Sequence, residues 1–442
     1  MSDYIYILEN HLSADQNRVV QEVQSAAGQA NVNVFLTGGA MRDMLAGFRI
    51  RDLDFVVEGP ALKIAKTVSD RTGAQITASD DNRKYAELLF PSGVTAQIAM
   101  SRQEKYARSG AKPQVSAATI QEDLRGRDFT CNAVALSLNR ASRGLLLDPL
   151  NGLADIERRE LRAAGPYGFY DDPSRLLRLI RLRVRLGFTI EARTAMQVAN
   201  AHEAEVEKLI PPRVFAEELQ RVSAEDSPAE IMSGLDEAGI LTLFAPALSG
   251  PKLNLAGLTK LEKLAHLLPD EARNRAARLG PFLWVLTEKL SGKEKPAVLK
   301  AVDLSKTDAA AFQKLEARAK KLETALRSAR IRKPSQVYQI VNAAAPDEIM
   351  LTLYHSTLKP VQERLRSYFQ KYLPAIQEIT PEEWATVEGK PGTPKYQKAR
   401  DQFVTNRLDR RPPKKPAEDE EETVAPPPPP PSAPEPVLAR RR

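Results

Sequence analysis

Alternating and short apolar runs predict strands and helices over the first 150 residues. In VTAQIAM (94–100), apolar side chains take every second position, which is the period of a half-buried strand. Helical spacing follows at 61–73 and 119–125. An α+β domain at 1–150, built around one mixed sheet, is the fold that this order predicts. The other predicted strands are VNVFLT (32–37), LDFVVEG (53–59), NAVALSL (132–138) and RGLLLDPL (143–150).

Beyond about residue 153 the strand pattern fades and helical periodicity takes over. Apolar residues recur there at i, i+3 and i+4, which predicts an all-helical second half without a fixed-period repeat. The clearest helical segments are 172–188, 213–225, 228–244 and 308–331.

The last part, 385–442, changes character and is predicted to be disordered or partly polyproline II. A basic, weakly apolar stretch (390–415) precedes the acidic EDEEE (418–422) and an unbroken proline run at 426–431. Such a composition cannot bury a core. The basic stretch fits a nucleic-acid contact and a solvated linker equally well.

Composition narrows the class of protein. The 442 residues are 42% hydrophobic and 27% charged, as in soluble globular proteins, and the net charge of +7 points only weakly to a polyanionic partner. A single cysteine, Cys131, excludes an internal disulfide and a cysteine-based zinc site. Neither a signal peptide nor an apolar stretch near 20 residues is visible, so we expect a cytoplasmic protein without membrane contact.

Two aspartates stand inside one predicted strand, at RIRDLDFVVEG. Asp52 and Asp54 are two residues apart, so both point to one face of the strand. Carboxylates placed in this way can hold Mg²⁺, which prefers oxygen ligands and often shares them with substrate phosphates. The alternative is a solvent-facing strand edge that pairs with Arg51.

A glycine pair precedes this strand, in FLTGGAMRDMLAG. Gly38 and Gly39 predict a tight turn between a strand and a short helix, where free backbone N–H groups can meet an anion. Met41, Met44 and Leu45 are expected to form the buried face of that helix, which leaves Arg42 and Asp43 free, and Gly47 is expected to end it. The alternative is a plain strand–turn–helix connection, and neither a P-loop nor a Rossmann fingerprint is present.

The segment YDDPSRLLRLIRLRVR predicts a helix with a basic stripe. Asp172 followed by Pro173 is typical of a helix start, with aspartate as the N-cap. An apolar stripe is expected from Leu177, Ile180 and Val184. Four arginines on one face are costly unless something anionic faces them. They are Arg175, Arg178, Arg181 and Arg185.

Five ordered motifs resemble those of class II nucleotidyltransferases, the family of the CCA-adding tRNA nucleotidyltransferases and bacterial poly(A) polymerases. The resemblance covers roughly 32–190 closely, and the helical remainder has no sharp motif. The first motif is LTGGAMRDMLAGFRIRDLDFVV, with GG, RD and DxD in the family's order. The others are SRQEKY, EDLRGRDFTCNAVAL, LLDPLNGLADIERRELR and DDPSRLLRLIRLRVRLGF.

The resemblance implies roles for named residues. Asp52 and Asp54 would be catalytic and bind Mg²⁺, and Gly38, Gly39 and Arg42 would meet the nucleoside triphosphate. Asp172 and Arg175 would read the incoming base, as an acceptor beside a donor fork. The remaining nucleotide-binding residues implied are Arg127, Asp128, Asn132, Arg178 and Arg181.

The resemblance also implies an architecture and a reaction. A polymerase-β-like palm (1–150) would be followed by a base-selecting neck (151–215) and a tRNA-binding body and tail (216–384). The predicted reaction is template-independent addition of CCA to the tRNA 3′ end from CTP and ATP. A poly(A) polymerase or A-adding enzyme of the same fold is the alternative. A catalytically weakened RNA-binding protein is a second.

Three positions depart from the family pattern. Gly126 stands where the family has the first of two arginines, and Asp171 replaces a more usual glutamate. Gln97 stands where a third carboxylate is expected, and a neutral amide is a poor metal ligand. We therefore expect two aspartates to suffice, with Gln97 outside direct contact with the metal.

Overall fold

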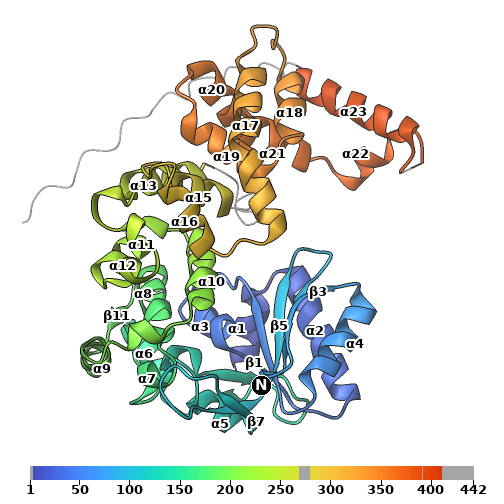
Figure 1. Ribbon diagram of the computed structural model, residues 1–442. Coiled ribbons are helices and arrows are strands. Elements are labelled where there is room, and N and C mark those ends of the chain that lie inside the picture. Colours follow the sequence, from blue (N-terminus) through green and yellow to red (C-terminus); the bar gives the residue numbers. More distant parts are fainter. Residues whose placement is uncertain (1–2, 268–278, 391, 411–442) are drawn as a thin grey trace, which may run out of the picture. The chain divides into compact units, whose positions relative to one another are not determined.

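The computed structural model (Figure 1) describes residues 3–267, 279–390 and 392–410. The chain divides into two compact units. The first comprises Met1–Ser328 and Ile340–Arg366, and the second comprises Ala329–Gln339 and the described part of Ser367–Arg442. All predicted site residues fall in the first unit.

A seven-stranded mixed sheet forms the N-terminal part of the first unit, in the order β3-β4-β5-β2-β1-β8-β9. Its neighbours are antiparallel except β2 and β5, which run parallel. The prediction of one mixed sheet is therefore confirmed. The strands are β1 (Val34–Thr37), β2 (Leu53–Val57), β3 (Gln75–Asp80), β4 (Tyr85–Leu89), β5 (Thr95–Met100), β8 (Ala135–Ser137) and β9 (Leu146–Leu147).

The two faces of this sheet differ in character. Leu53, Phe55 and Val57 of β2 are buried in one large core together with side chains of α2 (Ala14–Gln29) and α4 (Ala61–Thr72). Because strand side chains alternate, Asp54 points to the other face. On that face a smaller apolar cluster holds Val56 with Ile120 and Leu124 of α5 (Ile120–Arg125). One face thus carries the core and the other exposes polar side chains.

The remaining elements of this part are short. The helices predicted at 61–73 and 119–125 are α4 and α5, each within a residue of its predicted start and end. Thr119 and Glu122 form a reciprocal capping box at the start of α5. The other elements are α1 (Asp3–His11), α3 (Gly38–Leu45), the hairpin β6 (Arg102–Lys105) and β7 (Gln114–Ala117), η1 (Thr130–Asn132) and α6 (Gly152–Arg158).

After α6 the described residues of the first unit form helices apart from one pair of two-residue strands, β10 (Glu160–Leu161) and β11 (Thr189–Ile190). The prediction of a helical second half is confirmed. The bounds are α7 (Gly168–Asp171), α8 (Arg175–Leu186), α9 (Ala192–Glu203), η2 (Val206–Leu209), α10 (Pro212–Ser223), α11 (Pro228–Glu237), α12 (Ile240–Phe244), η3 (Pro246–Leu248), η4 (Gly250–Lys252), α13 (Leu255–Ala265), α15 (Leu279–Leu286), α16 (Glu294–Ala301), α17 (Lys306–Arg327), α19 (Pro346–His355) and α20 (Lys359–Ser367).

The second unit corrects the prediction of disorder for part of the C-terminal stretch. Residues Pro394–Asp409 form helix α23, whose Leu408 is buried with Ile376 and Ile379. Trp384 and Phe403 pack beside them. Few apolar residues suffice here because aromatic side chains bury a large area each. The proline run lies outside the described residues. The other elements are α18 (Pro334–Asn342), which begins in this unit, η5 (Tyr368–Tyr372), α21 (Leu373–Gln377) and α22 (Pro381–Ala385).

In the described part of the chain, none of the helices combines the length and the apolar character that a membrane crossing requires.

Candidate active site

The glycine pair lies directly against Asp54. The N–H of Gly39 donates to Oδ2 of Asp54 over 2.8 Å. Gly38 has a φ of +62°, and a Cβ there would lie 3.0 Å from the same oxygen. A Cβ on Gly39 would lie 3.1 Å from it. A side chain at either position would crowd the carboxylate, and at Gly38 it would also be strained by the positive φ.

The two aspartates differ in their surroundings, and their negative charges repel each other. Asp52 is exposed and precedes β2, which begins at Leu53 as the run LDFVVEG predicted, so only Asp54 lies inside the strand and not both aspartates as expected. Burial, and then repulsion by Asp52, raise the pKa of Asp54 from 3.8 to about 6, although Arg127, the Gly39 N–H and Arg42 act in the opposite direction. Two close carboxylates that repel each other fit a hard divalent cation.

The donor set around this pair is small. In the part of the chain that the structure describes, no group of three or more His, Cys, Asp or Glu side chains is arranged to hold a metal ion. The Thr95 hydroxyl donates to Asp52, and Gln97 is the direct neighbour of Asp54 on the parallel strand β5. Glu87 follows opposite Gln97 on β4. Asp52 and Asp54 are therefore the two carboxylates that could hold a divalent cation here.

Arg42 is buried, which corrects the prediction that α3 leaves it and Asp43 free. The exposed fractions of Arg42 and Asp43 are 3% and 2%. The Arg42 guanidinium donates to Asp43 over 2.7 Å and to Oδ1 of Asn132 over 2.8 Å. Because η1 packs against α3, this side of the helix faces protein, and the buried charge is compensated by its ion pair.

Asn132 and Asp128 continue this chain of contacts toward α8. Nδ2 of Asn132 donates to Oδ1 of Asp128 over 3.0 Å, and Oδ2 of Asp128 pairs with Arg178 at 2.7 Å. Burial opposes ionisation of Asp128, but Arg178 and Asn132 outweigh it and lower its pKa to about 2. The predicted nucleotide-binding residues Arg42, Asn132, Asp128 and Arg178 are thus linked to one another.

Arg127 and Arg175 are held by a different set of contacts. Nε of Arg127 donates to Asp123 over 2.7 Å, and the Arg127 charge lowers the pKa of Asp54, so it lies near the aspartate pair. Arg175 donates to the carbonyl oxygens of Arg127 and Gly126 over 3.1 and 3.0 Å. A Cβ on Gly168 would lie 2.9 Å from Nη1 of Arg175. The backbone of the RGRDFT motif therefore orients Arg175.

The helix predicted to have Asp172 as its N-cap and Pro173 as its first residue begins two residues later, with Ser174 in the cap position and Arg175 as its first residue. Asp172 instead accepts from the N–H of Ser174 over 3.1 Å and from its hydroxyl. A turn separates Asp172 from the helix because α7, which ends at Asp171, lies immediately before it. The apolar stripe is also shifted, since Ile180 and Val184 are only half-buried. The apolar residues that α8 buries are Leu176, Leu177, Leu179, Leu182 and Leu186.

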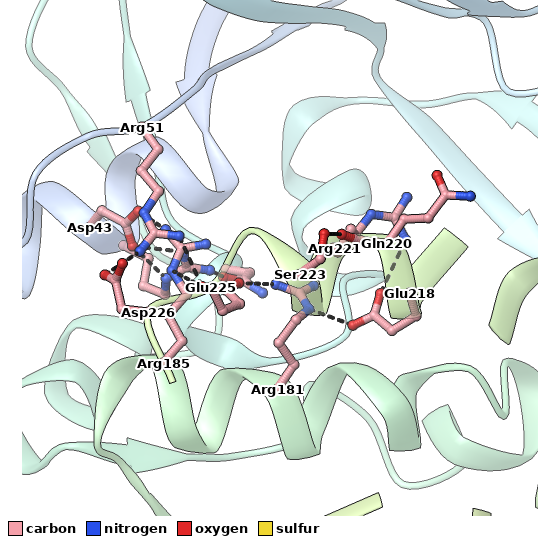
Figure 2. A network of polar contacts seen from close by, with 12 residues as sticks. Asp43, Arg51, Arg181, Arg185, Glu218, Gln220, Arg221, Ser223, Glu225 and Asp226 are labelled. Atoms are coloured by element: carbon pink, nitrogen blue, oxygen red, sulfur yellow. Dashed lines mark hydrogen bonds and ion pairs between the residues drawn. The ribbon is translucent and has the colours of Figure 1, made fainter. Parts of the chain in front are cut away.

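Carboxylates of the protein itself face the arginine stripe of α8, as Figure 2 shows for its second half. Arg181, whose exposed fraction is 8%, pairs with Glu218 and with Glu225. Arg185 pairs with Asp43 at 2.6 Å. The anionic partner that the stripe requires is therefore supplied by α3, by α10 and by the turn after α10. In this conformation Arg181 is directed at these carboxylates rather than at a nucleotide.

Arg83, on the turn between β3 and β4, was not among the site residues predicted from the sequence. It pairs with Glu104 of β6, which also binds Arg102 and accepts a hydrogen bond from Tyr106 over 2.7 Å. Burial and then Glu104 raise the pKa of Tyr106, and Asp172 raises it further while Arg175 lowers it. The SRQEKY motif therefore lies near the predicted base-reading pair. Arg83 is close to this motif only in space, so no pattern in the sequence could have placed it at the site.

Comparisons with known proteins identify the family. The model of the poly(A) polymerase head domain matches residues 34–162. The CC-adding tRNA nucleotidyltransferase of Deinococcus radiodurans is 34% identical over 272 residues, which cover 61% of this chain and 70% of that protein. The chain belongs to the class II nucleotidyltransferases, the family of the CCA-adding enzymes. The resemblance found in the five motifs is thereby confirmed.

Other family members match over different lengths. The A-adding tRNA nucleotidyltransferase of Geobacter sulfurreducens is 24% identical over 432 residues, which cover 92% of this chain and 47% of that protein. The A-adding enzyme of Halalkalibacterium halodurans is 32% identical, with 60% of this chain and 61% of that protein covered. The chain thus spans about half to three fifths of the length of these two relatives.

Solved structures support the fold. A structure described as a tRNA-processing enzyme in an apo form gives a TM-score of 0.55 at 22% identity, and covers 90% of this chain and 99% of that one. A CCA-adding enzyme in an apo form gives a TM-score of 0.53 at 23% identity, and the match covers 91% of this chain and 94% of that one. The arrangement of a mixed-sheet head followed by helices is therefore shared with these proteins.

Proposed function

We propose that this protein is a tRNA nucleotidyltransferase that adds CCA to tRNA 3′ ends from CTP and ATP without a template. One observation carries the proposal. The Asp54 carboxylate is seated against the Gly38-Gly39 turn and beside Asp52, with the cationic Arg127 close by. This arrangement suits a reaction in which a cation and a triphosphate must meet. Family membership supports the same reaction.

The two aspartates would hold Mg²⁺. The ion would lower the pKa of the attacking tRNA 3′ hydroxyl and neutralise charge on the phosphates. The hydroxyl oxygen attacks the α-phosphorus of the nucleotide, and pyrophosphate leaves. Asp54 must be ionised to bind a cation, so its pKa of about 6 allows binding at neutral pH.

Backbone and arginine groups would hold the nucleotide. The N-terminal end of α3, where the Gly39 N–H already donates to Asp54, and the nearby Arg127 would provide positive charge for the triphosphate. Arg42, Asp128 and Asn132 are proposed nucleotide contacts as well. They are at present bonded to one another, to Asp43 and to Arg178, so they would act through a rearranged hydrogen-bond chain.

Asp172 and Arg175 are the proposed base readers. Arg175 is anchored by two backbone carbonyls, and Asp172 by Ser174. Such anchoring fixes the direction of a donor fork and an acceptor, which is what selection of C or A requires. Arg175→Ala should blur the preference between CTP and ATP more than it slows transfer. An unchanged preference would count against this role.

Addition of A alone is the second candidate. Three relatives, which match 92%, 60% and 46% of this chain, are A-adding tRNA nucleotidyltransferases. A CC-adding enzyme and multifunctional CCA proteins are similar as well. The nucleotide specificity therefore has to be measured on defined substrates.

The test uses tRNA transcripts that end before CCA or after CC, with Mg²⁺ and labelled CTP or ATP offered separately and together. Two C residues followed by one A support CCA addition. A single A on the CC-ended transcript alone supports the second candidate, and long A tails would indicate a poly(A) polymerase. Asp52→Ala should abolish incorporation but leave tRNA binding intact. Asp81→Ala, at an exposed aspartate of the β3–β4 turn, is the matched control.

A further inference from the structure

The residue before Asp52 is tied to a distant part of the chain. The Arg51 guanidinium pairs with Glu225 at 2.9 Å and with Asp226 at 3.1 Å (Figure 2). Both carboxylates lie between α10 and α11, more than 170 positions along the chain. A guanidinium that binds two carboxylates through separate nitrogens is fixed in orientation as well as in place.

Glu225 is itself firmly held. Its side chain is 5% exposed. Oε1 pairs with Arg181 at 3.0 Å, and Oε2 lies 4.0 Å from Nε of Arg185. Both arginines belong to α8, and Arg185 reaches on to Asp43 of α3. Arg51 is therefore anchored to a rigid cluster of charges.

The backbone at Asp52 has little other support from the sheet. Asp52 precedes Leu53, the first residue of the ladder between β2 and β5. Ile50 is buried in the large core, and its carbonyl accepts from the Gln16 side chain. Between Ile50 and β2, the polar contacts are the Thr95 hydroxyl on Asp52 and the two ion pairs of Arg51. The direction of the Asp52 carboxylate thus depends on how its neighbours are anchored.

We propose that Arg51 is a positioning residue, clamped by Glu225 and Asp226 so that Asp52 is held beside Asp54 in its metal-binding place. The turn between α10 and α11 then sets the geometry of the metal site. This inference rests on the proposed function, because it takes Asp52 and Asp54 as the metal ligands. It adds that the helical half of the first unit supports that site directly.

If Arg51 acted only through its charge, its replacement would change the affinity for a divalent cation in one direction, and if it acted by positioning Asp52, in the other. The side chain is a cation near the site, so its removal by charge alone would strengthen the binding of a divalent cation. Loss of positioning would weaken it. Arg51 is 37% exposed, so its replacement is more easily tolerated than that of the buried Glu225.

The test measures Mn²⁺ binding by electron paramagnetic resonance on the full chain without nucleotide. Arg51→Met should raise the Mn²⁺ Kd on the order of tenfold, as loss of groups that orient a metal ligand does. Arg51→Lys keeps the charge but not the fork and should give a smaller rise. Arg221→Met is the matched control, because Arg221 pairs with Glu218 in the same cluster but does not adjoin Asp52. Its Kd should equal that of the wild type.

The outcomes separate this inference from the proposed function. Tighter binding by Arg51→Met, an unchanged Kd for Arg51→Lys or equal weakening by Arg221→Met would overturn the positioning role. Asp52→Asn should remove the Mn²⁺ site. If the wild type binds no Mn²⁺ that depends on Asp52, the metal assignment itself fails. Circular dichroism of each variant shows whether it is folded. If Arg51→Met does not fold, the Mn²⁺ Kd of Arg51→Lys decides whether Arg51 positions Asp52.

Discussion

Neutralising Asp54 should stabilise the protein while it destroys the proposed metal site. In Asp54→Asn the amide oxygen can still accept from the Gly39 N–H, so the substitution removes mainly the charge. The pKa of Asp54 is raised from 3.8 to about 6 in the folded protein by burial and by Asp52. The folded state therefore binds a proton more tightly than the unfolded state does.

The size of the effect follows from linkage. A carboxyl with a raised pKa contributes stability below pH 3.8, and that contribution is lost as pH rises through about 6. Ionising Asp54 then costs the folded state about 1.6 kcal/mol at pH 5 and about 3 kcal/mol at pH 8. The gain of Asp54→Asn over the wild type should thus grow by about 1.4 kcal/mol between these pH values.

Urea unfolding followed by circular dichroism, without divalent cations, measures this gain at each pH. Asp52→Asn is the comparison, because Asp52 is exposed and its loss only removes its repulsion of Asp54, so its gain should be smaller. The reasoning is refuted if Asp54→Asn is no more stable than the wild type at pH 8, or if its advantage is the same at pH 5.

Four further predictions concern other parts of the molecule. Gln97→Glu places a third carboxylate next to Asp54 and should lower the Mn²⁺ Kd on the order of tenfold in the resonance assay; an unchanged Kd would contradict it. Gly38→Ala, at a φ of +62° and 3.0 Å from Oδ2 of Asp54, should weaken Mn²⁺ binding, whereas Gly47→Ala, with a similar strain but open space around it, should not. Arg178→Met removes the partly exposed cation that pairs with buried Asp128, so the free energy of unfolding should fall by about 1 to 3 kcal/mol at pH 7 and by less at pH 3, and a loss independent of pH would refute it. Leu408→Ala should speed proteolysis within α23 with little effect on nucleotide transfer, and equal cleavage rates would show that this helix does not depend on its buried contact.

The sequence by itself determined the local elements and the chemistry at the site. The two-residue period of β5 and the apolar spacing of α4 are local properties, and they predicted these elements correctly. The Gly38-Gly39 turn and the Asp52, Asp54 pair were visible for the same reason, since each depends on residues that are close in the chain. What the sequence did not show is that Asp54 lies against both glycines, where a side chain would crowd its carboxylate.

The tertiary structure decided which charges meet. The arginines of α8 read from the sequence as a stripe for an external anion, but Arg178, Arg181 and Arg185 each reach a carboxylate of this chain. Arg42 was expected to be free and is buried because η1 packs against α3, where Asn132 accepts from its guanidinium. Ion-pair partners are set by packing and have no fixed spacing along the chain. A helical period can place a charge on one face, but only the fold determines what lies opposite.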